Sequence, residues 1–456
     1  MSAARRIGIL AGGGSLPREI ADSIAARGIP LHIVAIDGEA DADFGPYPVT
    51  RVNWGEIGRM VATFKQTDCA DLVIIGSVKR PDLATIKPDM GFVAALGTIL
   101  RLVLAGGDDR VLRGVIHFFE KRGFRIVSPA RLAPELVIGA GQITSAPLPD
   151  TVAADARLGF EIIAALGRFD IGQAAIVTNG TLEALEAAEG TDRMLARLAA
   201  ERRAGGGPLA AAEGVLVKRT KPSQDDRIDL PVIGPETITR ASGSGLAALV
   251  VEAGRALAAN REELTARAAA SGLAVAGLEI ARGRASAGSN LTASGTRSWT
   301  ERALTALRGR RAARNLETHQ LGQRAIPASS LRDIRKGLAV IEALTPWCDT
   351  RAVVVVRGHV LAVETGEGVT AALERAAGLR QWGDKRLRRR SGAVVIDAGR
   401  FCETAQVAIA ASAGFAGLIV KLRRFTAGVP AETIRAADKA GIFVAGIPTD
   451  GDERHG

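Results

Sequence analysis

The stretch RIGILAGGGSLPREIADSIAARG (6–28) carries the signals that set the fold of the N-terminal part of the chain. Its first residues, 6–12, form an apolar run typical of a buried strand, and its last residues form an amphipathic segment typical of a helix. Three consecutive glycines lie where the chain must turn from the strand into the helix. The stretch therefore predicts a strand, a glycine loop and a helix.

Three further apolar runs continue this pattern: LHIVAID (31–37), DLVIIGSV (71–78) and FRIVSP (124–129). Strands that alternate with amphipathic helices indicate a parallel sheet with helices on its faces. We therefore expect an α/β fold with a Rossmann-like domain over residues 1–148. Ligands of such sheets bind at the carboxyl ends of the strands.

Two groups of residues follow predicted strands at that edge. The glycine loop would let the backbone approach a phosphate, and the helix N-terminus behind it would favour an anion; its residues are Gly12, Gly13, Gly14, Ser15 and Leu16. The loop does not match GxGxxG, so the dinucleotide fingerprint is not met, and a plain tight turn is the alternative. The second group follows the third run and is suited to phosphate or to solvated surface: Gly76, Lys79 and Arg80. Asp109 opens a predicted helix, where an acid is more often a cap than a ligand.

The rest of the chain contains one segment twice. Residues 155–192 align without a gap with residues 333–370, an offset of 178. Further on, GLAALVV (245–251) matches GFAGLIV (414–420) at an offset of 169, so the second copy is shorter in between. We expect a catalytic α/β domain over 149–283, an arginine-rich linker over 284–330, and a degenerate second copy over 331–456.

The two copies differ most at KPSQDDRIDLP (221–231). The first copy reads GVLVKRTKPSQDDRIDLPVIG, and the second reads GAVVIDAGRFCET. Lys218 and Lys221 align with Ile396 and Gly399, and no DxxxD pattern remains. Folding requires the apolar pattern, whereas chemistry requires the polar cluster. We infer that the second copy has kept the fold and lost the site.

The polar residues of the first copy suit metal-assisted phosphoryl chemistry. Asp225 and Asp229, with the amide of Gln224, offer the hard oxygen ligands that Mg²⁺ prefers. Lys218 and Lys221 would neutralise a phosphate. The alternative for this loop is a charged turn.

A shorter motif, EGTD (189–192), precedes a predicted helix of the first copy. Thr191 and Asp192 are further substrate-binding candidates, and an N-cap formed by Thr191 is the alternative.

The composition limits the classes of function. The chain has 456 residues, 47% of them hydrophobic, and no apolar run is long enough to span a bilayer. Three distant cysteines and five scattered histidines argue against a cysteine-ligated zinc site and a serine–histidine mechanism. The net charge of +10 suits an anionic partner, but aromatic residues are only 4% of the chain, too few to interleave with the arginines as a stacking surface for nucleic acid. We therefore expect no nucleic-acid partner. The N-terminus shows no signal peptide, so we expect a cytoplasmic protein.

Taken in order, several motifs resemble the LpxI-type UDP-2,3-diacylglucosamine pyrophosphatase family over residues 5–280. They are GILAGGGSLPREIA, IGSVKRPDL, GDDRVLRGV, EAAEGTDRML and GVLVKRTKPSQDDRIDLPVIGPETI. The resemblance implies a two-domain enzyme of lipid A synthesis that uses Mg²⁺. It would cleave UDP-2,3-diacylglucosamine to UMP and 2,3-diacylglucosamine 1-phosphate (lipid X), with water attacking the sugar-side phosphorus.

The resemblance also implies an essential aspartate in the KPxQDxRxDLP motif, for which we favour Asp225. Catalysis is assigned to Asp225, Asp229 and Lys221, and metal binding to the two aspartates. The resemblance favours a peripheral position on the cytoplasmic face of the inner membrane, where a basic surface would help. A protein that binds a nucleotide sugar or acylated sugar without cleaving it is the alternative.

The resemblance implies a protein that ends near residue 280, so residues 284–456, with the degenerate second copy, are an addition to it. This addition leaves the oligomeric state open. A homodimer is one arrangement. For the second copy, the alternatives are that it replaces a dimer partner within the chain, binds lipid, or has no part in catalysis.

Overall fold

The computed structural model describes residues 5–78, 88–94, 97, 108–204, 212–221, 224–280, 318–348, 352–380, 390–396, 402–422 and 429–448. The chain forms two compact units, Met1–Asp150 with Ala211–Glu279, and Thr151–Ala210 with Ile280–Gly456. Among the described residues, no helix is both long and apolar enough to cross a bilayer.

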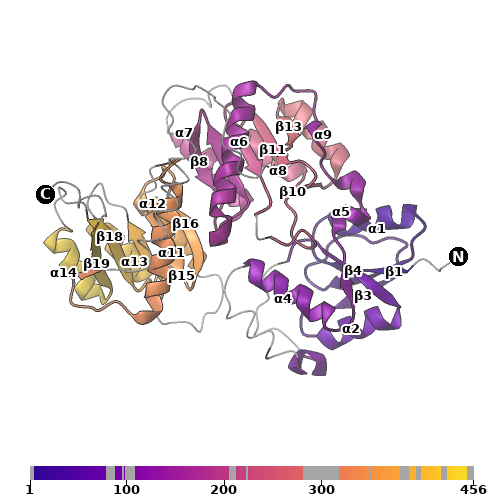
Figure 1. The fold of residues 1–456 in the computed structure, drawn as a ribbon, viewed down its shortest axis with the longest axis horizontal. Helices are drawn as coiled ribbons and strands as arrows, with labels where there is room; N and C mark the ends of the chain where they lie inside the picture. Colours follow the sequence, from indigo (N-terminus) through magenta and orange to yellow (C-terminus); the bar gives the residue numbers. More distant parts are fainter. Residues whose placement is uncertain are drawn as a thin grey trace, which may run out of the picture. The chain divides into compact units, whose positions relative to one another are not determined.

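The first unit begins with a parallel five-stranded sheet (Figure 1). Its order is β3-β2-β1-β4-β5, with every neighbouring pair parallel. The strands are β1 (Arg6–Ala11), β2 (Leu31–Ile36), β3 (Val49–Val52), β4 (Cys69–Ile75) and β5 (Arg125–Ile126). The predicted Rossmann-like α/β fold is confirmed. Strand β3 was not predicted, because VTRV is a short edge strand that is largely solvent-accessible and carries little apolar signal.

Helices cover both faces of this sheet. On one face, Ile9 of β1 packs in a cluster with Ile20 of α1 (Leu16–Ala26). On the other face, Leu10 packs in a cluster with residues of α2 (Ile57–Gln66) and α4 (Asp108–Glu120). Because both faces are buried, the strands read as continuous apolar runs rather than alternating ones.

The first unit also contains a second set of strands, in the order β6-β13-β11-β9. They are β6 (Gly141–Gln142), β9 (Val215–Lys218), β11 (Ala248–Glu252) and β13 (Ala274–Leu278). A separate parallel pair joins β10 (Val232–Ile233) to β12 (Leu257–Ala258). The helices here are α8 (Pro235–Gly243) and α9 (Arg261–Ser271), whereas α5 (Pro129–Leu132) packs with α1 on the N-terminal sheet.

The second unit combines part of the first copy with the whole described second copy. From the first copy come α6 (Asp150–Leu166), the hairpin β7 (Ala174–Thr178) and β8 (Thr181–Leu185), and α7 (Thr191–Ala204). The second copy forms a sheet in the order β14-β19-β18-β17-β15-β16. Its strands are β14 (His319–Gln320), β15 (Ala352–Val356), β16 (His359–Val363), β17 (Ala393–Ile396), β18 (Gly417–Leu422) and β19 (Phe443–Pro448). Its helices are α11 (Ala328–Leu344), α12 (Val369–Arg380), α13 (Thr404–Ser412) and α14 (Ala431–Ala440).

The strand registers of the two copies agree residue by residue. The β7–β8 hairpin carries a bulge between Ile176 and Val177, and the β15–β16 hairpin carries one between Val354 and Val355. These positions differ by the 178 residues expected from the sequence. A bulge is a specific local device, so its repetition supports duplication of a complete fold.

A buried aspartate supports the same turn in each copy. Asp155 accepts hydrogen bonds from the backbone N–H groups of Asn179 and Gly180, at 2.9 and 2.7 Å. Asp333 accepts the same pair of bonds at the turn of its own hairpin, at 2.8 and 2.7 Å. The first turn residue has a positive φ in both copies, a conformation that such two-residue hairpin loops require. The predicted second copy is thus confirmed in backbone detail.

Candidate functional site

The glycine loop lies at the topological switch point of the N-terminal sheet. Strand β1 pairs with β2 on one side and with β4 on the other, so the chain order reverses between β1 and β4. Backbone hydrogen bonds join the loop that follows β1 to the loop that follows β4. Gly13 N donates to the backbone oxygen of Ser77 at 2.7 Å, and Ser77 N donates back at 2.9 Å. Open α/β sheets bind ligands at this position.

Two glycines are required by the closeness of these loops. A Cβ on Gly12 would lie 2.5 Å from the backbone oxygen of Ser77. A Cβ on Gly76, whose φ is +104°, would lie 2.7 Å from the carbonyl carbon of Gly12. Both glycines therefore serve the mutual packing of the loops, whatever ligand the edge binds.

Gly14 and Ser15 are the exposed part of the loop. Gly14 N donates to the Asp41 carboxylate at 2.7 Å, so this N–H group is already engaged. Ser15 precedes α1 and makes no side-chain cap hydrogen bond. Leu16 points into the core, with 5% of its surface exposed, so only its backbone is available to a ligand.

Three predicted site residues cannot be placed in this geometry. Lys79 and Arg80 lie outside the described residues. Asp109 belongs to the first turn of α4, but its side chain lies outside the described set.

Two hydrogen bonds join Lys221 to Gln224, and residues 222 and 223 between them lie outside the described residues. The Gln224 side-chain oxygen accepts the backbone N–H of Lys221 at 2.8 Å, and Gln224 N donates to the Lys221 backbone oxygen at 3.0 Å. Both side chains are buried. Gln224 thus acts as a local structural residue that fixes the start of the acidic stretch.

Asp225 forms a bidentate ion pair with Arg227. Its Oδ1 accepts from Nε of Arg227 at 2.9 Å and from the backbone N–H at 3.1 Å, and its Oδ2 accepts from Nη2 at 2.7 Å. These hydrogen bonds hold the pKa of the Asp225 carboxyl below its usual 3.8, against the opposing effect of burial. Asp225 is therefore ionised at neutral pH and suited to binding a cation or orienting water.

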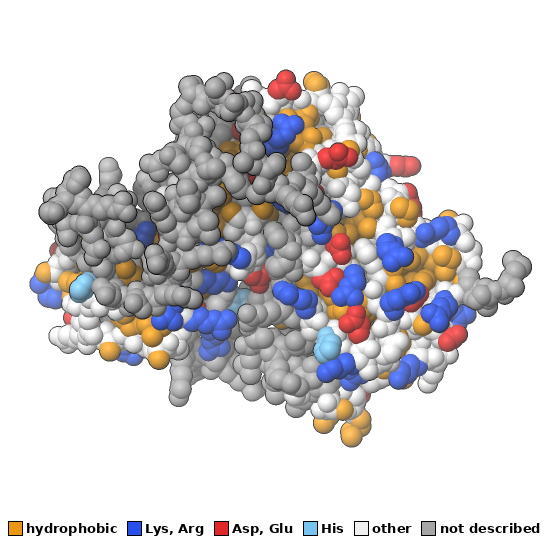
Figure 2. Space-filling view, viewed as in Figure 1, with side chains coloured by type: hydrophobic (Ala, Val, Ile, Leu, Met, Phe, Trp, Pro, Cys, Tyr) orange, Lys and Arg blue, Asp and Glu red, His pale blue; other side chains and the backbone are white. Residues whose placement is uncertain are grey.

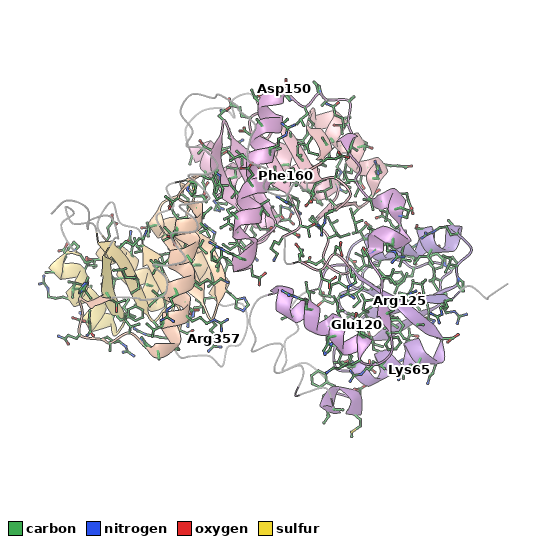
Figure 3. The ribbon with its side chains drawn as sticks, in the orientation of Figure 1. Lys65, Glu120, Arg125, Asp150, Phe160 and Arg357 are labelled. Carbon is green, nitrogen blue, oxygen red and sulfur yellow. The ribbon has the colours of Figure 1, made fainter. Side chains whose placement is uncertain are left out.

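Arg227 also connects the loop to the N-terminal sheet domain. Its Nη1 donates to Glu120 at 2.7 Å, and Glu120 is the last residue of α4 (Figure 3). The hydrogen bond to Asp225, followed by the one to Glu120, raises the pKa of the guanidinium, which stays charged. Arg227 was not predicted as a site residue from the sequence. Its only signal was an arginine two residues after the favoured aspartate.

Apolar side chains anchor the same loop. Ile228 packs against the cluster on one face of the N-terminal sheet, and Leu230 belongs to the cluster on the opposite face. Ser128 Oγ donates to the backbone oxygen of Asp226 at 3.0 Å. The loop is therefore held to the sheet domain by both packing and hydrogen bonds.

Two other predicted residues lie on or beside this loop. Asp229 N donates to the backbone oxygen of Asp225 at 3.2 Å, which places the two acidic residues one turn apart. Lys218 ends β9, is 6% exposed, and donates from Nζ to the backbone oxygen of Val232 at 2.9 Å. The structure thus gathers five candidates on one stretch of the first unit: Lys218, Lys221, Gln224, Asp225 and Asp229.

Thr191 and Asp192 belong to the second unit. They open α7, and Thr191 Oγ1 donates to Glu186 at 2.9 Å. Glu186 is buried and also accepts the backbone N–H of Gln173 at 2.7 Å. Asp192 is exposed in the first turn of the helix. Their roles as substrate ligands stay predictions.

The donor set of the first unit fits a shared Mg²⁺ site. A carboxylate offers about four lone pairs, and the hydrogen bonds from Arg227 use three of those on Asp225. Magnesium is commonly bound by about one or two carboxylates together with substrate phosphates. Within the described residues there is no cluster of three or more His, Cys, Asp or Glu side chains that could hold a metal without such help.

Comparison with known proteins matches the chain to two domain models of one family and to a relative. The LpxI N-terminal domain model matches residues 6–136, and the LpxI C-terminal domain model matches twice, at 139–276 and 317–445. The UDP-2,3-diacylglucosamine pyrophosphatase LpxI of Caulobacter vibrioides is 37% identical over 263 residues. That region covers 58% of this chain and 93% of the relative.

Proposed function

The chain belongs to the LpxI family, and from this we propose that it hydrolyses UDP-2,3-diacylglucosamine to UMP and lipid X in lipid A synthesis. The observation that carries the proposal is the intact KPSQDDRIDLP loop of the first copy, in which hydrogen bonds from Arg227 orient the Asp225 carboxylate and lower its pKa. The second copy lacks this loop, so the first copy holds the site.

The reaction adds one water across the pyrophosphate. The water oxygen forms a bond to the sugar-side phosphorus, the bond from that phosphorus to the bridging oxygen breaks, and UMP leaves with the bridging oxygen. Asp225 orients the attacking water or a bound cation, with Asp229 one turn away. Lys221 and Lys218 offset the negative charge that builds up on the phosphoryl oxygens.

We propose Mg²⁺ as the cofactor, with Asp225 and Asp229 as its protein ligands. When bound, the ion would neutralise phosphate charge and lower the pKa of a coordinated water. The lone pair left on Asp225 Oδ2 supports this assignment. Within the part of the chain that the structure describes, Arg227 leaves that position open while fixing the plane of the carboxylate.

We also propose that the protein works on the cytoplasmic face of the inner membrane. A substrate with two acyl chains resides in a bilayer, and the first unit exposes the apolar side chains of Met90 (83%) and Val93 (52%). Figure 2 shows lysine and arginine side chains spread over the viewed face of the molecule, with acidic ones among them. The net charge of +10 favours an anionic surface.

The test is UMP release from UDP-2,3-diacylglucosamine in Mg²⁺ buffer by the full chain, with Asp225→Asn and Asp226→Asn compared. Asp226 is the adjacent carboxylate, more than half exposed and 3.5 Å from Arg255. We expect Asp225→Asn to reduce turnover by about 10²–10³ and Asp226→Asn to leave it near the wild-type value. Stable substrate binding without UMP release by the wild-type protein would instead favour the binding-protein alternative.

A further inference from the structure

Four charged residues join the two copies inside the second unit. Glu189 precedes α7 and Arg197 lies on it, both in the first copy. Glu367 precedes α12 and Arg375 lies on it, both in the second copy. Each residue of the second pair follows its counterpart by 178 positions, the offset of the duplication.

The contacts among these residues are reciprocal. Within the copies, Arg197 pairs with Glu189 at 3.0 Å, and Arg375 pairs with Glu367. Between the copies, Arg375 reaches Glu189 at 3.3 Å and Arg197 reaches Glu367 at 3.9 Å. The arginine of each copy thus contacts the glutamate of the other. This is the pattern of an isologous, twofold interface, in which one surface patch pairs with itself.

The cluster is buried. The glutamate side chains are each 3% exposed, and those of Arg197 and Arg375 are 13% and 10% exposed. Nε of Arg197 and Nε of Arg375 are also buried, and neither has a hydrogen-bond acceptor among the described residues. This feature therefore also repeats at the offset of the duplication. Charges at this depth are tolerated only when paired, and each glutamate here lies within 3.9 Å of one arginine from its own copy and one from the other copy.

Apolar and backbone contacts accompany the charges. Ala188 of the first copy packs against the hydrophobic core of the second copy. Thr365 Oγ1 of the second copy donates to the backbone oxygen of Glu183, on β8, at 3.1 Å. The contact between the two copies therefore involves β8 and α7 of the first copy and the corresponding edge of the second copy.

We propose that the second copy acts as a built-in dimer partner of the first: it occupies, within the chain, the position that an identical subunit would take on this face. The face has self-complementary charges, as a homodimer interface does, and the second copy covers it. This role requires the fold and the Glu–Arg pair but not the catalytic loop, and those are the features that the second copy has kept. The protein is then a monomer in solution, and this face is not available to a second chain.

A charge-swap cycle in the full chain tests the pairing. Glu367→Arg with Arg375→Glu keeps the pair within the second copy but sets like charges against the first copy. Glu189→Arg with Arg197→Glu does the same from the other side. All four substitutions together restore opposite charges both within and between the copies. Because Glu201 lies 3.4 Å from Arg197, Glu201→Gln is included in every variant and in the reference protein.

The readout is the melting temperature by calorimetry. We expect each two-residue swap to lower it by more than about 5 °C, and the four-residue variant to regain at least half of the summed loss. Losses that simply add would mean that each pair serves its own copy alone, and the proposal would be wrong.

The solution mass of the unmodified protein gives a second test that requires no variant to fold. Sedimentation or light scattering should give the single-chain mass of 47.4 kDa over a wide concentration range. A stable species of twice that mass would overturn the proposal.

Discussion

Asp225 and Arg227, two residues apart on one loop, form a bidentate ion pair whose other guanidinium nitrogen, Nη1, binds Glu120 of α4. A planar guanidinium fixes both the orientation and the charge of the carboxylate, which a lysine ammonium cannot do equally well. Arg227 therefore acts on the proposed reaction through Asp225.

Replacing Arg227 should change the pH dependence of the proposed activity. Arg227 lowers the pKa of Asp225, so in Arg227→Gln this pKa rises and the acid limb of the kcat/KM profile moves to higher pH. We expect turnover at neutral pH to fall by about 10- to 100-fold because the carboxylate loses its fixed orientation. Arg227→Lys should keep part of the effect of the positive charge on the pKa of Asp225, but less of the control over the orientation of its carboxylate.

Glu120→Gln is the matched control, because it weakens the outer contact of Arg227 and leaves the contact with Asp225 in place. A smaller loss of activity and an acid limb close to that of the wild type are expected. An acid limb that does not move in Arg227→Gln would show that Asp225 is not the group that titrates.

Gly12→Ala should destabilise the protein. The added Cβ would lie 2.5 Å from the Ser77 backbone oxygen, so the two loops at the switch point would have to separate. We expect a loss of about 1–3 kcal/mol in the free energy of unfolding, measured by urea titration. Gly243→Ala, at the end of α8 with nothing within 4 Å of the new Cβ, is the control and should be neutral or slightly stabilising. Equal effects of the two variants would contradict the close approach of the loops.

The sheet was predictable because its strands are buried on both faces and therefore read as unbroken apolar runs. The duplication was predictable because residues that support the same turn recur at one spacing along the chain, as Asp155 and Asp333 do. The position of Asp225 on an acidic loop also followed from the sequence. The domain boundaries stay predictions.

The partners of the site residues were not predictable in the same way. Arg227 is held by Glu120, which lies 107 positions away in the chain. Only the tertiary fold brings these two side chains together. Gln224 stays a predicted substrate ligand, but the hydrogen bond that its side-chain oxygen accepts from Lys221 N–H could not be read from the motif. The cluster of Glu189 and Arg375 depends on packing between the copies, for which no local pattern exists.

Acid should weaken the second unit through Glu367. Burial opposes ionisation of this carboxyl, but Arg375 and Arg197 outweigh it and hold its pKa below the usual 4.5. A group with a lower pKa in the folded state contributes stability above its unfolded pKa and loses it as the pH falls through the folded value. The melting temperature should therefore drop as the pH falls below 4.5, and Glu367→Gln should make that drop smaller.

Glu374→Gln removes an exposed carboxylate from the same helix and is the control for Glu367→Gln. Its melting temperature should follow that of the wild type across the pH series. If both variants had the same acid dependence, the cluster would not be the source of the effect.

Removal of Mg²⁺ should abolish the proposed UMP release, because neither the lysines nor Asp225 alone supplies a Lewis acid for the phosphoryl oxygens. We expect no release after treatment with a chelator and full recovery on addition of Mg²⁺, followed by chromatography of the nucleotide. Full activity in the chelator would contradict the proposed cofactor.

The position of water attack can be read from isotope labelling. Attack on the sugar-side phosphorus gives UMP the bridging oxygen and gives lipid X the oxygen from water. Hydrolysis in ¹⁸O-water should therefore place one ¹⁸O in the phosphate of lipid X and none in UMP, as measured by mass spectrometry of both products. The label in UMP would mean attack on the nucleotide-side phosphorus, and Asp225 would then have to face the other end of the pyrophosphate. Arg227 and Glu120 fix the position of the Asp225 carboxylate. The labelled product therefore also identifies the phosphorus that this carboxylate faces.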